Sequence, residues 1–271
     1  STRTLATLRE HLTLAPAAFL TLLERMQAMG GLVARAANRH LGKSEREAAG
    51  VLSSAQRHTH FLDSPRMTAT LGHSDFRFAD LKERPASIFL VLPPDRLDTY
   101  ARWLRLLVSQ AVTDMARSPA RPDKPVLFLL DEFAALGRLE PVERAMGLMA
   151  GYGLQLWPIL QDMHQLKATY GERAGTFMSN AGVIQTFGVN DHATADMLSR
   201  TIGDTTIEYD TVSTSRGTGW GDNRAGPSES ISGHVSARRL ATPDEIMRMR
   251  PDQLLLLRQG EHPLAVEKIR Y

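Results

Sequence analysis

The 271-residue sequence contains no cysteine, which excludes disulfide bonds and thiolate metal sites. It also has no uninterrupted apolar stretch approaching the roughly 18 residues of a membrane-spanning helix. Aromatic residues make up only 6% of the sequence, yet hydrophobic residues make up 42%, as is typical of a globular protein with a core. Ser1 is not an initiator methionine, so we expect the chain to be part of a longer protein whose membrane anchor, if any, lies elsewhere.

The sequence has little net charge, +2 in total, but its charge is unevenly distributed. The first sixty residues hold eight lysine and arginine residues against four glutamates, whereas the remainder is slightly acidic. A basic face can bind DNA phosphates, and a solvated helix surface has the same composition. On charge alone, the pattern favours the solvated helix surface over a DNA-binding face.

The first sixty-odd residues predict a helical unit. Apolar residues recur there at helical spacing, and Pro16 suits the first turn of a helix. Gly30-Gly31 is expected to kink or split the apolar stripe, and Ser44-Glu45-Arg46-Glu47 is typical of a capping box that begins another helix. We therefore expect residues 1–64 to form an all-α segment.

From residue 65 onward, apolar runs typical of strands alternate with helical patterns. The expected strands are 88–92, 126–130, 154–160, 183–187 and 254–257, with an edge strand at 265–269. The expected helices are 97–115, 140–150 and 191–200. This order predicts an α/β fold with a mostly parallel sheet and helices on both faces. Residues 211–237 are rich in serine, threonine and glycine, so we expect them to form a mobile loop.

The predicted strand 126–130 ends abruptly in two carboxylates, Asp131 and Glu132. In open α/β sheets, ligands bind beyond the carboxyl ends of the strands. A nucleoside-triphosphate motor needs such a pair, because one carboxylate holds Mg²⁺ and the next polarises the attacking water. Exposed carboxylates at a strand end or a helix cap are the structural alternative.

Gln161 ends the next predicted strand as Asp131 ends the strand before it. If the two strands are neighbours, a neutral amide lies beside the carboxylates, where it can orient water or sense a phosphate without adding negative charge. Taken alone, Gln161 is more typical of a position at the start of a helix.

Other candidate motifs favour structural roles. The segment 37–44 is similar to a P-loop, but Ala37 stands where the first glycine should be, and a helical stripe rather than a buried strand precedes it. We therefore expect Lys43 at the surface and Ser44 in a helix cap. The glycine-rich run 217–221 does not fit a dinucleotide fingerprint. His58 and His60 face different sides of a helix, which argues against a metal pair, and Asp191 suits a helix cap.

Several blocks of the sequence together resemble the TraG-like coupling proteins of type IV secretion and conjugation. The segment 128–137 is similar to the Walker B region of that family, and the likeness continues in order over roughly residues 50–271. The further matching blocks are Gly151-Tyr152-Gly153, Gln161 with Gln165-Leu166, Tyr170-Gly171, 179–182, 187–191, 195–203 and 239–271. A likeness over ordered blocks is far more specific than a single motif.

The resemblance implies a RecA-like, hexameric ATPase, anchored in the bacterial inner membrane, that drives single-stranded DNA or protein into a secretion channel. Residues 1–64 would be part of the family's all-α insertion domain, and 65–271 the C-terminal portion of its nucleotide-binding domain. With ATP and Mg²⁺ as cofactors, the resemblance assigns Mg²⁺ binding to Asp131, the general base to Glu132 and γ-phosphate sensing to Gln161. The implied partners are a DNA-processing (relaxase) complex and inner-membrane secretion components, at the cytoplasmic face of the membrane.

Two departures from the family pattern matter. The family's P-loop, first ATPase strand and membrane helices precede the all-α insertion, and none of them occurs in this sequence. The fragment alone is therefore expected to be inactive. Many members carry an arginine before the Gly-Tyr-Gly segment, where this chain has Ala150. Either Arg144 or Arg173 supplies the arginine finger, or the group is absent.

Two other functions stay open at this level. The chain could be a non-catalytic receptor or assembly module, whose basic helical unit docks a DNA-processing complex or a secreted protein. It could also belong to a related DNA-translocating ATPase outside secretion. Nothing in the sequence distinguishes plasmid DNA from an effector protein as the substrate.

Overall fold

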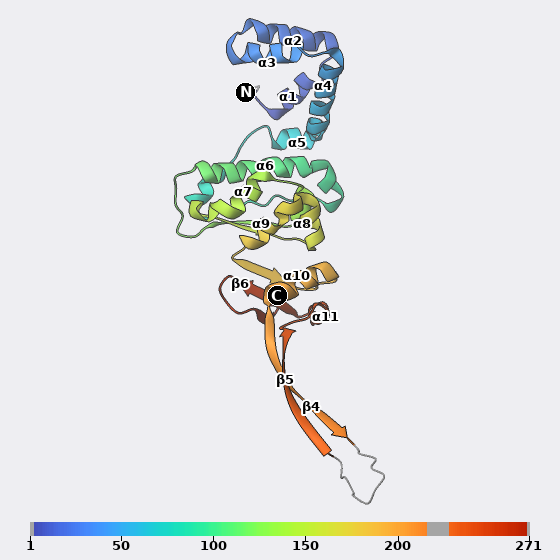
Figure 1. Cartoon of the computed structure of the whole chain (residues 1–271). Coiled ribbons are helices and arrows are strands. Elements are labelled where there is room, and N and C mark those ends of the chain that lie inside the picture. Colours follow the sequence, from blue (N-terminus) through green and yellow to red (C-terminus); the bar gives the residue numbers. More distant parts are fainter. Residues whose placement is uncertain (1–2, 216–227, 270–271) are drawn as a thin grey trace, which may run out of the picture. The chain divides into compact units, whose positions relative to one another are not determined.

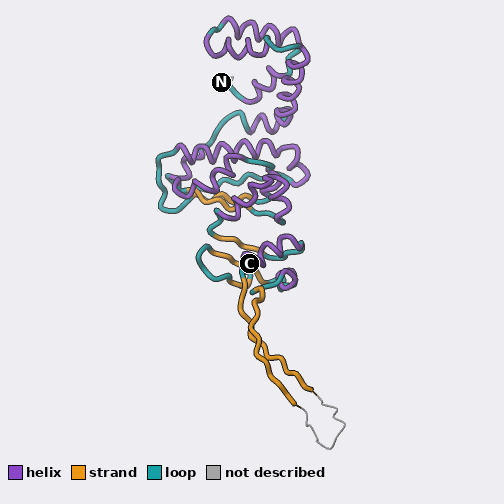
Figure 2. Tube along the Cα trace, in the orientation of Figure 1, coloured by secondary structure: helices purple, strands orange, loops and turns teal. Residues whose placement is uncertain are grey.

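The computed structural model describes residues 3–215 and 228–269. Contacts divide the chain into two compact units, Ser1–Ile159 and Leu160–Tyr271. Within the described residues, no helix combines the length and hydropathy needed to cross a bilayer. Figure 2 shows that the first unit is helical or irregular up to its first strand, and that the long strands belong to the second unit.

The expected helical segment is present, but it is divided into more helices than the apolar stripe suggested. The helices are α1 (Leu5–Leu12), α2 (Pro16–Ala28), α3 (Gly31–Leu41), α4 (Glu45–Thr59), the short 3₁₀ turn η1 (His60–Asp63) and α5 (Pro65–Thr70). Pro16 begins α2, and the Ser44 hydroxyl caps α4 by accepting from the Glu47 N–H, as predicted.

The Gly30-Gly31 pair reverses the chain between α2 and α3. Both glycines have positive φ, +71° and +59°, a conformation that costs a residue with a side chain free energy. The two helices then pack on each other, since Gln27 donates to Asn38 at 2.5 Å and the Phe19 ring meets His40 edge-on at 5.5 Å. The expected single stripe is thereby split into a helical hairpin.

Helix α6 (Leu97–Arg117) is the central element of the first unit. At one end, Trp103 packs with Phe61, Leu62 and Met67 in a cluster that holds the helical segment. At the other end, the buried Lys82 in η2 (Phe78–Lys82) donates to the carbonyls of Met115 (2.7 Å) and Ser118 (3.1 Å). These carbonyls belong to the last turn of α6, where a cation is favoured.

Two parallel strands lie on α6. Strand β1 (Val126–Leu130) pairs with β2 (Leu154–Pro158) in the register Val126↔Leu154 to Leu130↔Pro158. One face of this sheet packs against Ala111 and Met115 of α6, whereas the other face leaves Leu127, Leu129 and Trp157 exposed. Between the strands run η4 (Phe133–Leu136), α7 (Glu140–Leu148) and η5 (Met149–Tyr152). The predicted strand at 126–130 is confirmed.

The predicted strand at 88–92 is wrong. This fully described segment, which precedes η3 (Pro94–Arg96), is not part of any strand and has no ladder partner. Its side chains still alternate as in a strand, because Ile88 and Leu90 pack inward while Phe89 and Val91 are exposed. The sequence correctly encoded this alternation, whereas strand assignment also requires a neighbouring strand.

The second unit combines helices with antiparallel strands. Its elements are α8 (Met163–Tyr170), η6 (Gly171–Arg173), α9 (Ala174–Ser179), β3 (Val183–Thr186), α10 (His192–Ile202), β4 (Asp204–Ser215), β5 (Ser228–Arg239), α11 (Pro243–Met247), β6 (Gln253–Arg258) and β7 (Leu264–Glu267). The sheet order is β3-β6-β7, with both pairs antiparallel. Leu198 of α10 and Ile246 of α11 pack with Leu255 of β6 as the core of this unit.

The expected loop over 211–237 is wrong for the residues that the structure describes. Strands β4 and β5 pair over twelve residues each, from Asp204↔Arg239 to Ser215↔Ser228, and form a long hairpin (Figure 1). Residues 216–227, with the glycine-rich run 217–221, lie outside the described residues. Serine and threonine occur in strands as well as in loops. In this segment threonine, isoleucine, tyrosine and valine, which are common in strands, favour the pairing of β4 with β5.

The α/β class is confirmed, with parallel pairing in β1–β2 and antiparallel pairing in the second unit. The division of the sequence into a helical insertion over 1–64 and an ATPase portion over 65–271 stays a prediction.

The helical segment should show a pH-dependent stability that originates in Asp63. Arg9 donates to both oxygens of Asp63, each at 2.7 Å, and this hydrogen bonding lowers the pKa of the Asp63 carboxyl. A carboxyl whose pKa is lower in the folded than in the unfolded state stabilises the fold at pH values above its unfolded-state pKa, which is about 4. That stabilisation is lost as the pH falls through the folded pKa.

The substitution Asp63→Asn should therefore cost up to about 1 kcal/mol at pH 7, because the pair is partly exposed. The difference from the wild type should shrink below pH 4, as followed by urea denaturation with circular dichroism. Asp123→Asn, at an exposed loop carboxylate, is the matched control. A destabilisation by Asp63→Asn that is equal at pH 7 and pH 3 would contradict the electrostatic origin.

Candidate functional site

Asp131 and Glu132 stand at the carboxyl end of β1, as the sequence predicted. The adjacent strand is β2, and the parallel pairing continues past the last ladder residues. Ile159 donates its N–H to the Leu130 carbonyl at 3.0 Å, and the Phe133 N–H donates back to the Ile159 carbonyl at 3.2 Å. The expectation that these two strands are neighbours is confirmed. Both carboxylates are exposed at this end of the sheet.

Glu132 has an unusual backbone conformation. Its φ and ψ are 48° and 44°, and among the described residues it is the one non-glycine residue with positive φ. A left-handed conformation costs such a residue roughly 1–2 kcal/mol. Non-glycine residues held in sparsely populated conformations cluster at active sites, ligand clamps and switches. The backbone conformation therefore indicates a functional position at Glu132, independently of the chemistry of its carboxylate.

The turn after Glu132 explains why the strained conformation persists. Phe133, only 1% exposed, and the buried Leu136 fix the first and last positions of η4 in the core. The Ala135 N–H donates to the Glu132 carbonyl at 2.9 Å. Phe133 is fixed in the interior and its N–H is hydrogen-bonded to Ile159, so the chain changes direction at Glu132. The Glu132 side chain is exposed to solvent.

Arg105 of α6 holds the far end of the same turn. Its guanidinium donates to the carbonyls of Leu136 and Arg138, the latter at 2.9 Å. Gly137 lies between them with φ +62°, and a Cβ at this position would come within 2.8 Å of Arg105 Nη1. The glycine is required both by its conformation and by the close approach of the guanidinium. Sequence reasoning missed Arg105, because nothing in its local pattern relates it to a turn thirty residues later.

Gln161 is the second residue of the second unit, two residues after Ile159. Its N–H donates to Gln165 Oε1 at 3.2 Å, and the next residue, Asp162, caps α8 by accepting from the Gln165 N–H at 2.8 Å. The backbone at Gln161 is thus fixed by the start of α8, which matches the structural alternative, while its side chain is exposed. That the Gln161 side chain shares one site with Asp131 and Glu132 stays a prediction.

A polar connection joins α8 to α10 within the second unit. Asp191 caps α10 as predicted, accepting from the Thr194 N–H at 2.8 Å, and lies 3.5 Å from His164 Nε2. Burial alone would raise the pKa of Asp191, but the hydrogen bonds from Thr194 outweigh it and lower the pKa. The Thr194 hydroxyl also accepts from the Met163 N–H at 3.2 Å. The start of α8, just after Gln161, therefore rests on α10.

An arginine finger at Arg144 or Arg173, or its absence, stays a prediction. Arg144 of α7 pairs with Glu140 one turn earlier at 2.9 Å, and both side chains are well exposed. Arg173 ends η6 in the second unit. The side chain of Ala150 lies outside the described residues.

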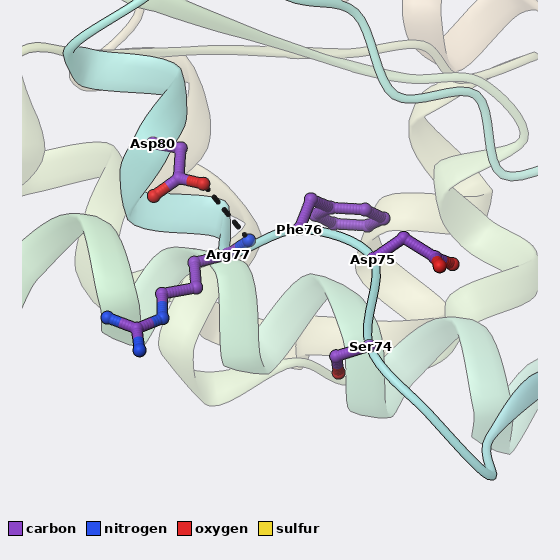
Figure 3. Close-up of a pocket in the computed structure, with 5 residues that line it drawn as sticks. All are labelled: Ser74, Asp75, Phe76, Arg77 and Asp80. Atoms are coloured by element: carbon purple, nitrogen blue, oxygen red, sulfur yellow. Dashed lines mark hydrogen bonds between the residues drawn. The ribbon is translucent and has the colours of Figure 1, made fainter.

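An open hollow in the first unit does not coincide with the candidate site. Ser74, Asp75, Phe76, Arg77 and Asp80 line it. Figure 3 shows the Arg77 guanidinium and the Asp75 carboxylate pointing away from each other, so no set of charged groups converges on a ligand. In the described part of the chain, no three histidine or acidic side chains group as a metal site.

Comparisons with known proteins place the chain in a family. The family model for type IV secretory system conjugative DNA transfer matches residues 24–271. The conjugal transfer protein TraG of Rhizobium radiobacter is 33% identical over 217 residues, which cover 79% of this chain and 33% of the relative. The VirD4 protein of Rhizobium rhizogenes is 31% identical over 210 residues, covering 76% and 30%.

Solved structures share the fold. The plasmid coupling protein TrwB in complex with the non-hydrolysable ATP analogue ADPNP superposes with a TM-score of 0.74 at 19% identity, over 98% of this chain and 58% of that one. TrwB in complex with ADP and Mg²⁺ gives a TM-score of 0.65 at 19% identity, over 84% and 51%.

The α/β fold of this chain is shared with these coupling-protein structures. The chain belongs to the conjugative DNA-transfer family of type IV secretion systems. It spans about a third of the length of the curated relatives that it matches.

Glu132→Gly should keep or raise the stability of the fold despite the loss of a side chain. Glycine relieves a left-handed strain of roughly 1–2 kcal/mol. Its greater freedom in the unfolded chain opposes this by about 0.4–1 kcal/mol. Glu132→Val should be clearly destabilising, because β-branched residues are outliers at positive φ.

Chemical denaturation of the two Glu132 variants measures this order directly. The same glycine and valine substitutions at Asp131, whose φ is not positive, are the matched control and should give the opposite order. A glycine variant of Glu132 less stable than the valine variant would contradict the left-handed assignment.

Proposed function

We propose that the chain is the C-terminal part of the ATPase motor of a conjugative coupling protein. The observation that carries this proposal is the pair Asp131 and Glu132 at the carboxyl end of a parallel strand, with Glu132 held in a strained conformation. Support from the relatives is that TrwB structures contain ADPNP, or ADP with Mg²⁺. The whole protein's activity is part of the proposal, because the chain spans about a third of its relatives.

The residues present fit the part of a Mg²⁺–ATP site that binds the metal ion and activates the attacking water. Mg²⁺ prefers oxygen ligands and keeps several of its waters, and Asp131 offers an exposed carboxylate at the sheet edge. When bound, Mg²⁺–ATP supplies the phosphoanhydride to be cleaved and neutralises its charge. The phosphate-cradling loop of such a site is not recognisable in this sequence, so this chain contributes only part of the site.

Glu132 is the proposed general base. It has a neighbouring carboxylate, faces solvent, and is fixed by the buried Phe133, so it can accept a proton from an attacking water. Gln161 is the proposed γ-phosphate sensor, because its amide donates without adding negative charge and its backbone is fixed by α8. Arg105 is a positioning residue, since it acts on Glu132 through the turn 133–138.

The assembly follows from the family. We propose a hexamer at the cytoplasmic face of the bacterial inner membrane, anchored by a segment outside these residues. In this proposal it takes single-stranded DNA from a relaxase complex, or a protein substrate, into a type IV secretion channel.

A non-catalytic receptor is the second candidate. The basic N-terminal helices favour it, because α3 exposes Arg35 and Arg39 without an ion pair in the described structure. Salt-dependent DNA binding by the chain, without ATP turnover by the whole protein, would favour this reading over the motor.

In the whole protein, Glu132→Gln should lower the ATP turnover number by at least about 100-fold, the usual contribution of a general base. Nucleotide binding should be unaffected, since the amide has the same shape. A coupled ATPase assay and a fluorescent-nucleotide titration measure the two quantities. Glu83→Gln, at an exposed glutamate of the same unit, is the control and should be fully active. Wild-type turnover in Glu132→Gln would remove Glu132 from the mechanism.

Residues 1–271 alone should bind ATP only weakly. Tight phosphate binding needs the backbone N–H groups of a glycine-rich loop, and the sequence contains no such loop after a strand. Isothermal titration calorimetry with ATP and Mg²⁺ is the test, and a longer chain from the same protein is the positive control. Micromolar affinity in residues 1–271 would show that the phosphate site has been assigned to the wrong part of the protein.

A further inference from the structure

The β4–β5 hairpin is an uncovered ribbon. All described side chains from 206 to 214 and from 229 to 238 are exposed. In the part of the hairpin that the structure describes, the contacts with other elements lie at its base, where the Gly203 carbonyl accepts from the Leu240 N–H at 3.0 Å and Arg238 pairs with Glu245 of α11 at 2.5 Å. Two strands without a third element are at best marginally stable in water. Such a ribbon is therefore expected to be covered by a partner.

The two faces of the ribbon differ sharply in chemistry. The register places Val212 opposite Ile231 and Glu208 opposite Val235 on one face. The same face carries the other two acidic residues of the ribbon beyond its base, Asp210 and Glu229. We call this set the acidic arm face: Glu208, Asp210, Val212, Glu229, Ile231 and Val235.

The opposite ribbon face carries no acidic side chain. It presents serines, threonines, Ile207 and the stacked rings of Tyr209 and His234, whose centroids lie 5.5 Å apart. The acidic groups are thus confined to one face, together with Val212, Ile231 and Val235, although cross-strand pairing alone does not require it. Ile231 and Val235, 68% and 70% exposed, are apolar groups left in water beside unpaired carboxylates. An acidic face repels nucleic acid, so a partner must be a basic protein surface with apolar groups.

Helix α3 offers a surface of that complementary chemistry. Its inner face packs on α2 through the fully buried Ala37 and through His40. Its outer face, which we call the α3 strip, consists of Leu32, Arg35, Ala36 and Arg39. These positions are spaced i, i+3, i+4 and i+7, and all four are exposed, Leu32 by 79%. Neither arginine has an acidic partner in the described structure.

We propose that the acidic arm face of one copy docks on the α3 strip of a second copy. The arm's carboxylates face the two arginines, and Ile231 and Val212 cover Leu32 and Ala36. The proposed contact consists of paired residues of β4 and β5. A helix face against a ribbon is a small interface, so a single contact is expected to be weak and to gain strength only when repeated in an assembly. This proposal goes beyond the proposed ATPase and does not depend on Glu132.

The absence of cysteine makes the contact directly testable. Full-length chains carrying Ile231→Cys and chains carrying Leu32→Cys, one of them with an affinity tag to distinguish sizes, are mixed and mildly oxidised. A mixed disulfide dimer should form in clear excess over both homodimers, and mass spectrometry should find residues 32 and 231 in one cross-linked peptide. Ser213→Cys, on the opposite ribbon face, and Thr21→Cys, on the exposed side of α2, are matched controls expected to cross-link poorly.

Charge-reversal variants distinguish a specific docking contact from cross-linking by random collision. Arg35→Glu with Arg39→Glu in the Leu32→Cys chain should reduce the mixed dimer about fivefold or more. Glu208→Lys with Asp210→Lys in the Ile231→Cys chain should restore it. Raising the salt to about 1 M, where the screening length is roughly 3 Å, should also weaken the wild-type contact.

Three results would overturn the proposal. The first is equal cross-linking of the controls and of Ile231→Cys with Leu32→Cys. The second is a predominant Ile231→Cys homodimer, which would mean that arms pair with arms. The third is an intrachain disulfide in the double variant at high dilution, formed in preference to the mixed dimer, because the arm would then cover its own α3.

Discussion

The parallel pairing of β1 with β2 is the constraint on which the candidate site depends. It continues through backbone hydrogen bonds of Ile159 with Leu130 and Phe133. These bonds fix the point where β1 stops, and the burial of Phe133 then determines that the chain must turn at Glu132. Because Phe133 and Leu136 are fixed in the core just after Glu132, the packing around Glu132 holds it in its strained conformation. Arg105 closes the turn from α6, so the carboxylate pair is held from both sides.

Sequence patterns identified the elements whose signal is local. The apolar run 126–130 predicted β1 with correct bounds, and the caps at Ser44 and Asp191 are formed as their side chains indicated. The carboxylate pair was found for the same reason, because a strand followed by two acids is visible within seven residues. The neighbouring position of β2 was also correct, since consecutive strands of a βαβ unit pair in most proteins.

Features that depend on distant residues were not predictable in the same way. Residues 88–92 have the alternation of a strand but no ladder partner, and alternation cannot report whether a partner exists. The serine- and glycine-rich composition of the hairpin β4–β5 predicts a loop, while its register depends on pairs of residues that are distant in sequence, such as Asp204 and Arg239. Glu132's conformation and the contact of Arg105 with Leu136 likewise arise from packing that a local pattern does not encode. Family resemblance supplied the roles of Gln161 and Asp131, which geometry within each unit leaves as proposals.

The bare side of the β1–β2 sheet has a practical consequence for work with the polypeptide in solution. Strands buried on both sides are the rule for parallel sheets, and here Leu127, Leu129 and Trp157 face water on one side. Exposed apolar groups of this kind, beside unpaired strand edges, promote aggregation during expression and concentration. Mild detergent, or a longer polypeptide that shields these three side chains, is therefore the sensible starting condition for purification. Light scattering during concentration would report whether the shielding is sufficient.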